Sequence, residues 1–291
     1  MDPRETLVRI DHDSGHGRWS LFRRRPPAWL APYVRSLEGY VEEGGRTIVR
    51  KELPFGGIPM ILIFGPGFFL RDASEPDRRR ALDRSFIAGL HERPTLVGSY
   101  GAALCMQVNF TPQGAWRFCD VNMSEISGQV VDLGGIVGAL AGRIEERLGG
   151  ERDWPSRFAL LEEFLWERLS RGRAGNPLAV EAWRRLEEKG GGIAVSGLAK
   201  SLDCSRKHLA HLFRREIGLT PKAAARILRF ERAVLGLQAG RLRTLAELAA
   251  SCGYADQAHF NRDFAAFAGE CPTALIEKTL ADGTGVMEEP G

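Results

Sequence analysis

Basic side chains are concentrated in one stretch of this 291-residue chain. Lys200–Arg229 contains eight Lys or Arg residues and two Asp or Glu, whereas the whole chain carries a net charge of only +3. Guanidinium and ammonium groups donate hydrogen bonds to phosphate oxygens and to the acceptor atoms of guanine, so this stretch favours a polyanionic partner. Charge alone gives no more than this, because a solvated helix face is often basic too.

The elements that would position these residues occur twice. Residues 195–199 (Val-Ser-Gly-Leu-Ala) match residues 245–249 (Leu-Ala-Glu-Leu-Ala) at an offset of 50, and further pairs follow at an offset of 51. These pairs are Leu209 with Phe260, Phe213 with Phe264, Gly218 with Gly269 and Pro221 with Pro272. Agreement in both residue type and order indicates an internal repeat.

Each copy has the residue order of a helix-turn-helix unit. A short helix with Leu-Ala on its buried face comes first, followed by a turn residue that tolerates a positive φ, Asp203 or Gly253. A capping residue, Ser205 or Asp256, then begins a second helix. The predicted units span 194–217 and 244–268, and Thr244 with Glu247 forms a capping-box pattern at the start of the second.

One helix is predicted between the units, from Pro221 to Gln238, because Pro favours a first turn and apolar residues recur at helical spacing behind it. At 1.5 Å per residue it would be about 27 Å long. Units at its two ends could present their second helices about one DNA turn, ~34 Å, apart. Lys222, Arg226 and Arg229 on this helix fit a solvated face as well as phosphate contact.

Two segments, Ser205–Pro221 and Gly253–Pro272, resemble the first and second units of the AraC/XylS family of bacterial regulators. The resemblance covers roughly residues 178–280 and implies that double-stranded promoter DNA is the partner. It further implies base contacts from the exposed N-terminal half of each second helix, with phosphate contacts from backbone amides at the helix starts. The candidate DNA-contacting residues are Ser205, Arg206, Lys207, Ala210, His211, Asp256, Gln257, Ala258, Asn261 and Arg262. The family often has Arg where His211 stands, and a larger polar residue at Ala258, so the preferred bases stay open.

The N-terminal part has a different pattern of apolar residues. Short apolar segments broken by Gly and Pro predict a strand-rich region from Trp19 to about residue 125. Apolar residues then recur at spacings of three and four over 132–171, which predicts two helices that form either domain core or a subunit interface. Residues 1 to about 17 are polar and expected to be loose. Gly172–Pro177 has the composition of a linker, and Gly190–Gly192 that of a flexible joint.

The family resemblance also implies a cupin-like domain that binds a small-molecule effector and contributes to a homodimer. The expected organisation is an effector-binding and dimerisation domain at 1–172, a linker and first helix at 173–190, a DNA-binding domain at 178–280 and a tail at 281–291. An aromatic lining would suit a small apolar or amphipathic effector. The candidate lining residues, each of which also fits plain core, are Trp19, Phe55, Phe64, Phe68, Phe69, His91 and Trp116.

The sequence carries no motif for catalysis or metal binding. A metal-dependent cupin needs a His-x-His pair, and the only histidines before residue 200 are His12, His16 and His91. Nucleophile-elbow, phosphate-loop and dinucleotide motifs are missing, and the five dispersed cysteines are typical of core filler. We therefore expect no enzyme activity, no metal and no cofactor. No apolar run is long enough for a membrane span and no signal-peptide pattern begins the chain, so a cytoplasmic location is expected.

The expected fold is α+β, with an N-terminal β-rich, cupin-like sensor domain, a helical interface segment and an all-α C-terminal domain with two helix-turn-helix units. The expected function is sequence-specific transcriptional regulation under the control of an effector. The alternative left open is a constitutive regulator whose N-terminal domain serves only dimerisation or protein contacts. RNA polymerase is a further candidate partner.

Overall fold

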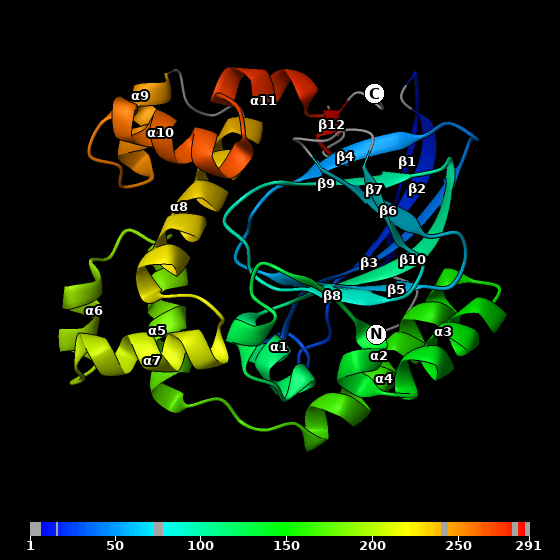
Figure 1. Ribbon diagram of the computed structural model, residues 1–291, viewed down its shortest axis with the longest axis horizontal. Helices are drawn as coiled ribbons and strands as arrows, with labels where there is room; N and C mark the ends of the chain where they lie inside the picture. Colours follow the sequence, from blue (N-terminus) through cyan, green and yellow to red (C-terminus); the bar gives the residue numbers. More distant parts are fainter. Residues whose placement is uncertain (1–6, 16, 73–77, 240–243, 281–284, 289–291) are drawn as a thin grey trace.

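The computed structural model describes residues 7–15, 17–72, 78–239, 244–280 and 285–288, and Figure 1 shows their arrangement. Two antiparallel sheets form the N-terminal part, and the C-terminal third is a group of helices beside them. The predicted α+β class, with a β-rich N-terminal part and a helical C-terminal part, is confirmed. In the described part of the chain, no helix has the length and hydrophobicity that a membrane span requires.

The first sheet has seven strands in the order β1-β2-β3-β10-β5-β8-β11. These strands are β1 (Leu7–Ser14), β2 (Gly17–Arg24), β3 (Val34–Glu43), β10 (Ala102–Phe110), β5 (Ile58–Ile63), β8 (Phe86–Ala88) and β11 (Val130–Asp132). The central strand β10 pairs with both β3 and β5, so that Cys105 lies opposite Tyr40 on one side and Ile63 on the other. This register fixes which side chains of the three strands share a face.

The second sheet has five strands in the order β12-β4-β9-β6-β7. These strands are β12 (Met287–Glu288), β4 (Ile48–Glu52), β9 (Thr95–Ser99), β6 (Phe68–Arg71) and β7 (Arg79–Leu82). The sheet faces the first one across an apolar core that includes Trp19, Tyr40 and Ile61. Its edge strand β12 belongs to the predicted tail and pairs with β4, Met287 opposite Arg50. Residues 281–284 and 289–291 of that tail lie outside the described residues.

The expectation of a loose segment up to about residue 17 is wrong, because Leu7–Ser14 forms strand β1 and pairs with β2 along its whole length. An edge strand with one solvated face needs few apolar residues. Polar contacts support it instead: Asp11 accepts a hydrogen bond from Arg9 Nε on the same strand at 2.8 Å and, across the strand pair, from the Ser20 hydroxyl at 2.5 Å. Residues 1–6 and 16 lie outside the described part of the chain.

Helical elements of 3 to 18 residues cover the outer face of the first sheet (Figure 1). They are α1 (Pro112–Cys119), η2 (Met123–Glu125), α2 (Leu133–Val137), α3 (Leu140–Gly150) and α4 (Trp154–Arg171). Gly39 on β3 makes room for this layer, since a Cβ there would lie 2.1 Å from the ring of Trp154. Ile144, Leu148, Phe158, Leu161, Leu165 and Leu169 are all buried. The inward face of the helices predicted over 132–171 is therefore domain core.

The C-terminal helices are α5 (Pro177–Glu188), α6 (Val195–Ser201), α7 (Arg206–Glu216), α8 (Pro221–Gln238), α9 (Leu245–Ser251), α10 (Gln257–Ala268) and α11 (Pro272–Lys278). The single helix predicted from Pro221 to Gln238 is confirmed. Leu209 and Phe213 of α7 join the core that the first sheet and its helices share, whereas Phe230, Phe260 and Phe264 form a separate core. The first unit is thus packed into the N-terminal part, and the second has a core of its own.

The glycine triplet after α5 is a tightly packed turn and not the flexible joint that its composition suggests. Gly190 and Gly191 have φ values of 52° and 73°, in the left-handed region that glycine tolerates best. The Gly191 amide donates to the Leu186 carbonyl at 2.8 Å, which ends α5. A Cβ at Gly191 would lie 2.0 Å from the carbonyl oxygen of Ala225 on α8. Close approach of two backbones requires glycine here.

Gly191→Ala should lower the free energy of unfolding by at least about 2 kcal/mol, because alanine would face both a strained φ and the Ala225 carbonyl. Gly197→Ala is the matched control, since a Cβ at Gly197 on α6 meets no atom within 4 Å. Alanine at that exposed helical position should raise stability by roughly 0.5–1 kcal/mol. Urea unfolding followed by circular dichroism measures both changes. Equal effects would contradict the packing of Gly191.

Candidate nucleic-acid interface and ligand cavity

The second helix of the first unit begins as the sequence predicts. Asp203 has a φ of 49° and turns the chain out of α6. The Ser205 hydroxyl then accepts a hydrogen bond from the His208 amide at 3.1 Å and so caps α7. No acidic residue lies in the first turn of α7. The helix start therefore presents amide groups and basic side chains with no local carboxylate to neutralise them.

The two faces of α7 differ sharply. Leu209, Leu212 and Phe213 are buried on one face. The opposite face carries the exposed residues Ser205, Arg206, Lys207, His208 and His211, with Ala210 half-buried among them. All five candidate DNA-contacting residues of this unit thus share one accessible surface.

The second unit repeats this geometry with different residues. Gly253 takes the left-handed turn position with a φ of 80°, and Asp256 caps α10 by accepting from the His259 amide at 2.6 Å. The capping box predicted at α9 is present, since Thr244 and Glu247 each accept from the other's amide, at 3.1 and 3.2 Å. Phe260, Phe264 and Phe267 are buried. The exposed residues on the other face are Asp256, Gln257, Ala258, Asn261 and Arg262.

Two arginines of α8 hold α10 in place. Arg226 Nη2 donates to an Asp263 carboxylate oxygen at 2.9 Å, and Arg229 lies 4.0 Å from the same carboxylate. The hydrogen bond that Arg226 donates to Asp263 raises the pKa of Arg226, which also contacts Glu92 at 3.2 Å. Both arginines therefore serve as internal ties, while Lys222 is exposed.

Figure 1 shows α7 and α10 at opposite ends of α8 and on the same side of the molecule. Because α8 has 18 residues, it is about 27 Å long at 1.5 Å per residue. The two exposed faces can thus meet one side of a DNA duplex, where major grooves recur about every 34 Å. The first face carries most of the positive charge, and Arg262 is the main cation of the second.

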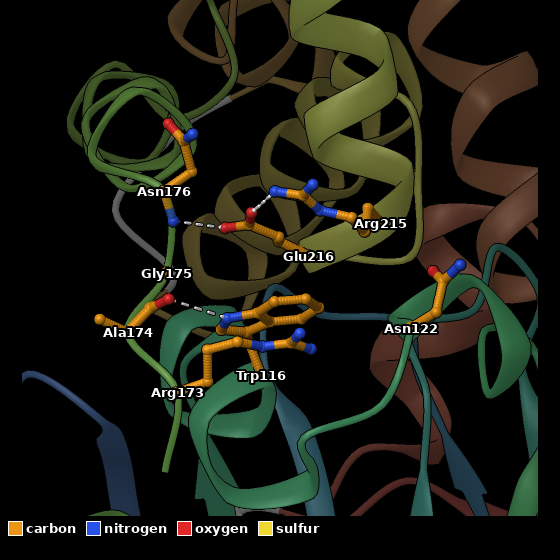
Figure 2. Close-up of a pocket in the computed structure, with 8 residues that line it drawn as sticks. All are labelled: Trp116, Asn122, Arg173, Ala174, Gly175, Asn176, Arg215 and Glu216. Carbon is orange, nitrogen blue, oxygen red and sulfur yellow. Dashed lines mark hydrogen bonds and ion pairs between the residues drawn. The ribbon is translucent and has the colours of Figure 1, made fainter.

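The far end of α7 meets the N-terminal part in a shallow surface groove (Figure 2). The Asn176 amide donates to the buried carboxylate of Glu216 at 2.7 Å, and Trp116 Nε1 donates to the Ala174 carbonyl at 3.4 Å. The Arg173 guanidinium lies 4.3 Å from the centre of the Trp116 ring. The segment with linker composition is therefore held on both sides. Trp116, a predicted effector-lining residue, belongs to this groove.

A separate cavity of about 370 Å³ lies between the two sheets. Of the residues predicted to line an effector site, Phe55, Phe68 and His91 line this cavity. Trp19 is buried in the core between the sheets, where the Arg50 guanidinium lies 4.4 Å from its ring. The structure thus brings three of the predicted aromatic or imidazole side chains to one cavity.

The placement of Phe64, Phe69 and Trp116 in an effector lining is not supported. The Phe64 ring lies under the Arg157 guanidinium, 5.1 Å away, at the helical layer outside the sheet. Phe69 is fully buried, and its ring fills the space that the missing side chain of Gly98 leaves. Neighbouring apolar residues end on different faces because side chains alternate along a strand.

Sequence reasoning missed the polar residues of the cavity. They are Glu38, Tyr40 and Glu42 on β3, Arg50 and Glu52 on β4, and Gln107 on β10. Their signal is the spacing of two, which places 38, 40 and 42 on one side of a strand. Cys105 lines the same cavity, and burial raises its pKa to about 12, so its thiol stays protonated. Among the described side chains, no group of His, Cys, Asp or Glu could hold a metal ion.

A profile described as a helix-turn-helix domain matches residues 198–278 of this chain. The Msm operon regulatory protein of Streptococcus mutans is 27% identical over 117 residues, which make up 40% of this chain and 42% of that protein. The chain therefore aligns with less than half the length of this curated relative.

Three solved structures are similar to parts of the chain. ToxT from Vibrio cholerae O395 aligns with 86% of this chain and 98% of its own, at 12% identity and a TM-score of 0.46. The C-terminal domain of AraT, a response regulator from Geobacillus stearothermophilus, aligns with 34% of this chain and 83% of its own, at 22% identity and a TM-score of 0.32. A probable AraC family transcriptional regulator from Rhodopseudomonas palustris CGA009 aligns with 33% and 95%, at 28% identity and a TM-score of 0.29.

The profile match runs from α6 to the end of α11 and so contains both copies of the repeat. Both copies have the turn, the cap and the exposed second helix that their residues predict. Residues 198–278 are thus similar to the helix-turn-helix domain that the profile describes.

Proposed function

We propose that the chain is a sequence-specific DNA-binding regulator whose helices α7 and α10 enter successive major grooves. One observation carries this proposal: at each end of α8, a capped helix exposes its N-terminal half and buries its opposite face. A helix that enters the major groove must have such an unobstructed face.

In the first unit, Arg206 and Lys207 donate hydrogen bonds to guanine O6 and N7. The Ala210 methyl group contacts a thymine methyl, and His211 adds a further contact one turn along the helix. The amides at the start of α7, next to Ser205, meet a backbone phosphate. The high positive charge of this unit supplies most of the salt-dependent affinity.

In the second unit, Arg262 is the guanine-binding candidate, and Asn261 can pair with adenine through its amide group. Gln257 and Ala258 lie in the first turn, where they face neighbouring bases. The amides that follow Asp256 meet phosphate. With one main cation, this unit contributes less to DNA affinity than the first. Its contacts mainly adjust which DNA sequence is preferred.

Lys207→Ala and Arg262→Ala should each relax base preference at a different half of the DNA site. Each loss should weaken binding to the preferred sequence by about 1–3 kcal/mol, because one good base contact is worth that much. Selection of bound sequences from random DNA, followed by affinity measurements on the selected site, tests both.

Arg171→Ala is the matched control, because Arg171 is an exposed arginine on α4, outside both recognition helices, with 77% of its side chain accessible. Its removal lowers the charge equally and should leave base preference unchanged. Uniform weakening on all sequences by Lys207→Ala and Arg262→Ala would mean that both residues contact only phosphate.

A small molecule in the cavity between the sheets controls DNA binding in this proposal. Besides residues of the sheets, the cavity is lined by Gln238 at the end of α8 and by Gly285 and Val286 just before β12. A ligand there would touch both the N-terminal part and the chain on either side of the second unit. It can therefore favour one arrangement of the two parts over another.

Buried ion pairs reinforce this link. Lys51 on β4 pairs with Glu270 before α11 and, at 2.6 Å, with Glu288 on β12. Lys278 on α11 contacts the carboxylates of Glu270 and Glu288, each at 3.0 Å. Burial acts to raise the pKa of Glu288, but the hydrogen bonds from Lys51 and Lys278 outweigh it and the pKa is lowered. The carboxylate thus favours the attached tail above its ordinary pKa, and this contribution is lost as pH falls through the lowered value.

Glu288→Gln should loosen β12 from β4, because both lysines lose a buried anionic partner. The local cost of about 1–3 kcal/mol corresponds to a 5- to 150-fold drop in amide protection around residues 285–288 and in β4. Hydrogen exchange read by mass spectrometry measures it. Glu277→Gln, at an exposed carboxylate of α11, is the control and should leave protection unchanged. Unchanged amide protection in Glu288→Gln would show that these ion pairs do not hold β12 on β4.

The active form is proposed to be a homodimer, which doubles the DNA footprint and raises affinity through effective concentration. The edge-to-face pair of Trp29 and Trp166, with ring centres 5.1 Å apart, exposes apolar surface on the outer side of α4 that a second chain can cover. RNA polymerase is the remaining candidate partner. A chain that stays monomeric at all concentrations, and whose DNA affinity does not change with ligand, would contradict this proposal. The chain would then be a constitutive regulator.

A further inference from the structure

The cavity between the sheets has a polar wall and an apolar wall. Side chains at alternate positions of β3 and β4 point into it, which brings Glu38 and Glu42 together with Arg50 and Glu52. The apolar wall carries the rings Phe55, Phe68 and Phe86 and the aliphatic residues Ile48, Ile61, Leu70 and Val97. A volume of about 370 Å³ suits a small organic molecule.

Two of these charged groups already have partners. Glu42 is buried and accepts hydrogen bonds from the Tyr40 hydroxyl at 2.7 Å and the Ser99 hydroxyl at 2.5 Å. The Arg50 guanidinium lies 4.4 and 4.6 Å from the ring centres of Trp19 and Tyr40 and donates to the Tyr40 hydroxyl at 2.7 Å. Its Nε, which has no partner among the described residues, is buried. Arg50 is thus held by the protein.

Glu52 differs from both. Within the described part of the chain, its carboxyl has no hydrogen bond or ion pair, and Glu52 lines the cavity as an exposed residue at the end of β4. Desolvation by the surrounding protein raises the pKa of this carboxyl, with Arg50 opposing that rise and the neighbouring Glu38 adding to it. Glu38 is weakly neutralised, since Arg23 approaches it only to 3.7 Å. His91 also lines the cavity, and burial lowers its pKa, which favours the neutral imidazole.

We propose that this cavity binds a small amphipathic molecule with a protonated amine, its ammonium group against Glu52 and Glu38 and its apolar body against Phe55, Phe68 and Phe86. An ammonium group supplies the hydrogen-bond donors that the unpaired Glu52 carboxyl lacks and neutralises the pair of acids. The aromatic rings add attraction for a cation. A carboxylate ligand would face two acids, while Arg50 is engaged by Tyr40 and Arg23 contacts Glu38. The inference rests on the proposed function of the cavity as the effector site.

Three probes with one skeleton test the charge preference on the full-length chain: 4-phenylbutylamine, 4-phenylbutanol and 4-phenylbutyrate. Isothermal titration calorimetry at pH 7 should give at least about tenfold tighter binding of the amine than of either other probe, since one tenfold step is 1.4 kcal/mol. Glu52→Gln should remove about tenfold or more of the amine affinity and leave the alcohol unchanged. Glu38→Gln should act in the same direction with a smaller effect, because Arg23 already contacts that carboxyl.

Glu43→Gln is the matched control, since Glu43 ends the same strand β3 but is exposed and outside the cavity lining. Unchanged alcohol binding and circular dichroism show that each variant is folded. Tighter binding of the butyrate, failure of all three probes to bind, or amine affinity that neither Glu52→Gln nor Glu38→Gln lowers would overturn the proposal. DNA affinity is measured separately on the same samples. Amine binding that leaves DNA affinity unchanged would uphold the ligand class and contradict effector control.

Discussion

Helix α8 is buried on two sides, and the arrangement of both recognition helices depends on this. Ala224 and Leu228 pack into the core that the first unit shares with the N-terminal sheet, whereas Phe230 and Ala233 pack into the core of the second unit. Successive turns of one continuous helix therefore serve two cores. Because an α-helix has a fixed rise per residue, the two units keep a fixed separation. Neither unit can shift along α8 without exposing apolar surface to water.

The C-terminal domain could be predicted because its helix caps and turns depend on residues that are close in sequence. The cavity could not be predicted in detail because it depends on pairing between distant strands. Ser205 and Asp256 cap their helices through contacts three residues away, so the sequence alone is sufficient there. Phe64 and Phe68 are only four residues apart, yet only Phe68 reaches the cavity, because a strand end and a turn separate them. Strand β1 was missed for a related reason, since an edge strand with a solvated face has the composition of a loop.

Charged side chains of this protein are concentrated in three different regions. The outer face of α7 carries the exposed cations Arg206 and Lys207, whereas the cavity brings the carboxyl groups of Glu38, Glu42 and Glu52 together. Between these regions, half-buried contacts join the two halves: Arg35 Nη2 contacts Glu231 at 2.6 Å, and the Gly56 amide donates to the same carboxylate at 2.9 Å. Such half-buried ties are sensitive to small displacements because each group would lose its partner and remain desolvated. These contacts tie two segments of the N-terminal part directly to α8.

The pairing of β12 with β4 also has a consequence for how the molecule is assembled. Strand β4, near residue 50, pairs with β12, near residue 288. The two strands are separated by most of the sequence, so their pairing closes one of the longest loops in the fold. Such a contact costs the most chain entropy to form and belongs to a late step of folding. During synthesis, the sheet edge at β4 stays open until both helix-turn-helix units have been made. The outer edge of the second sheet is therefore completed last, after the DNA-binding helices.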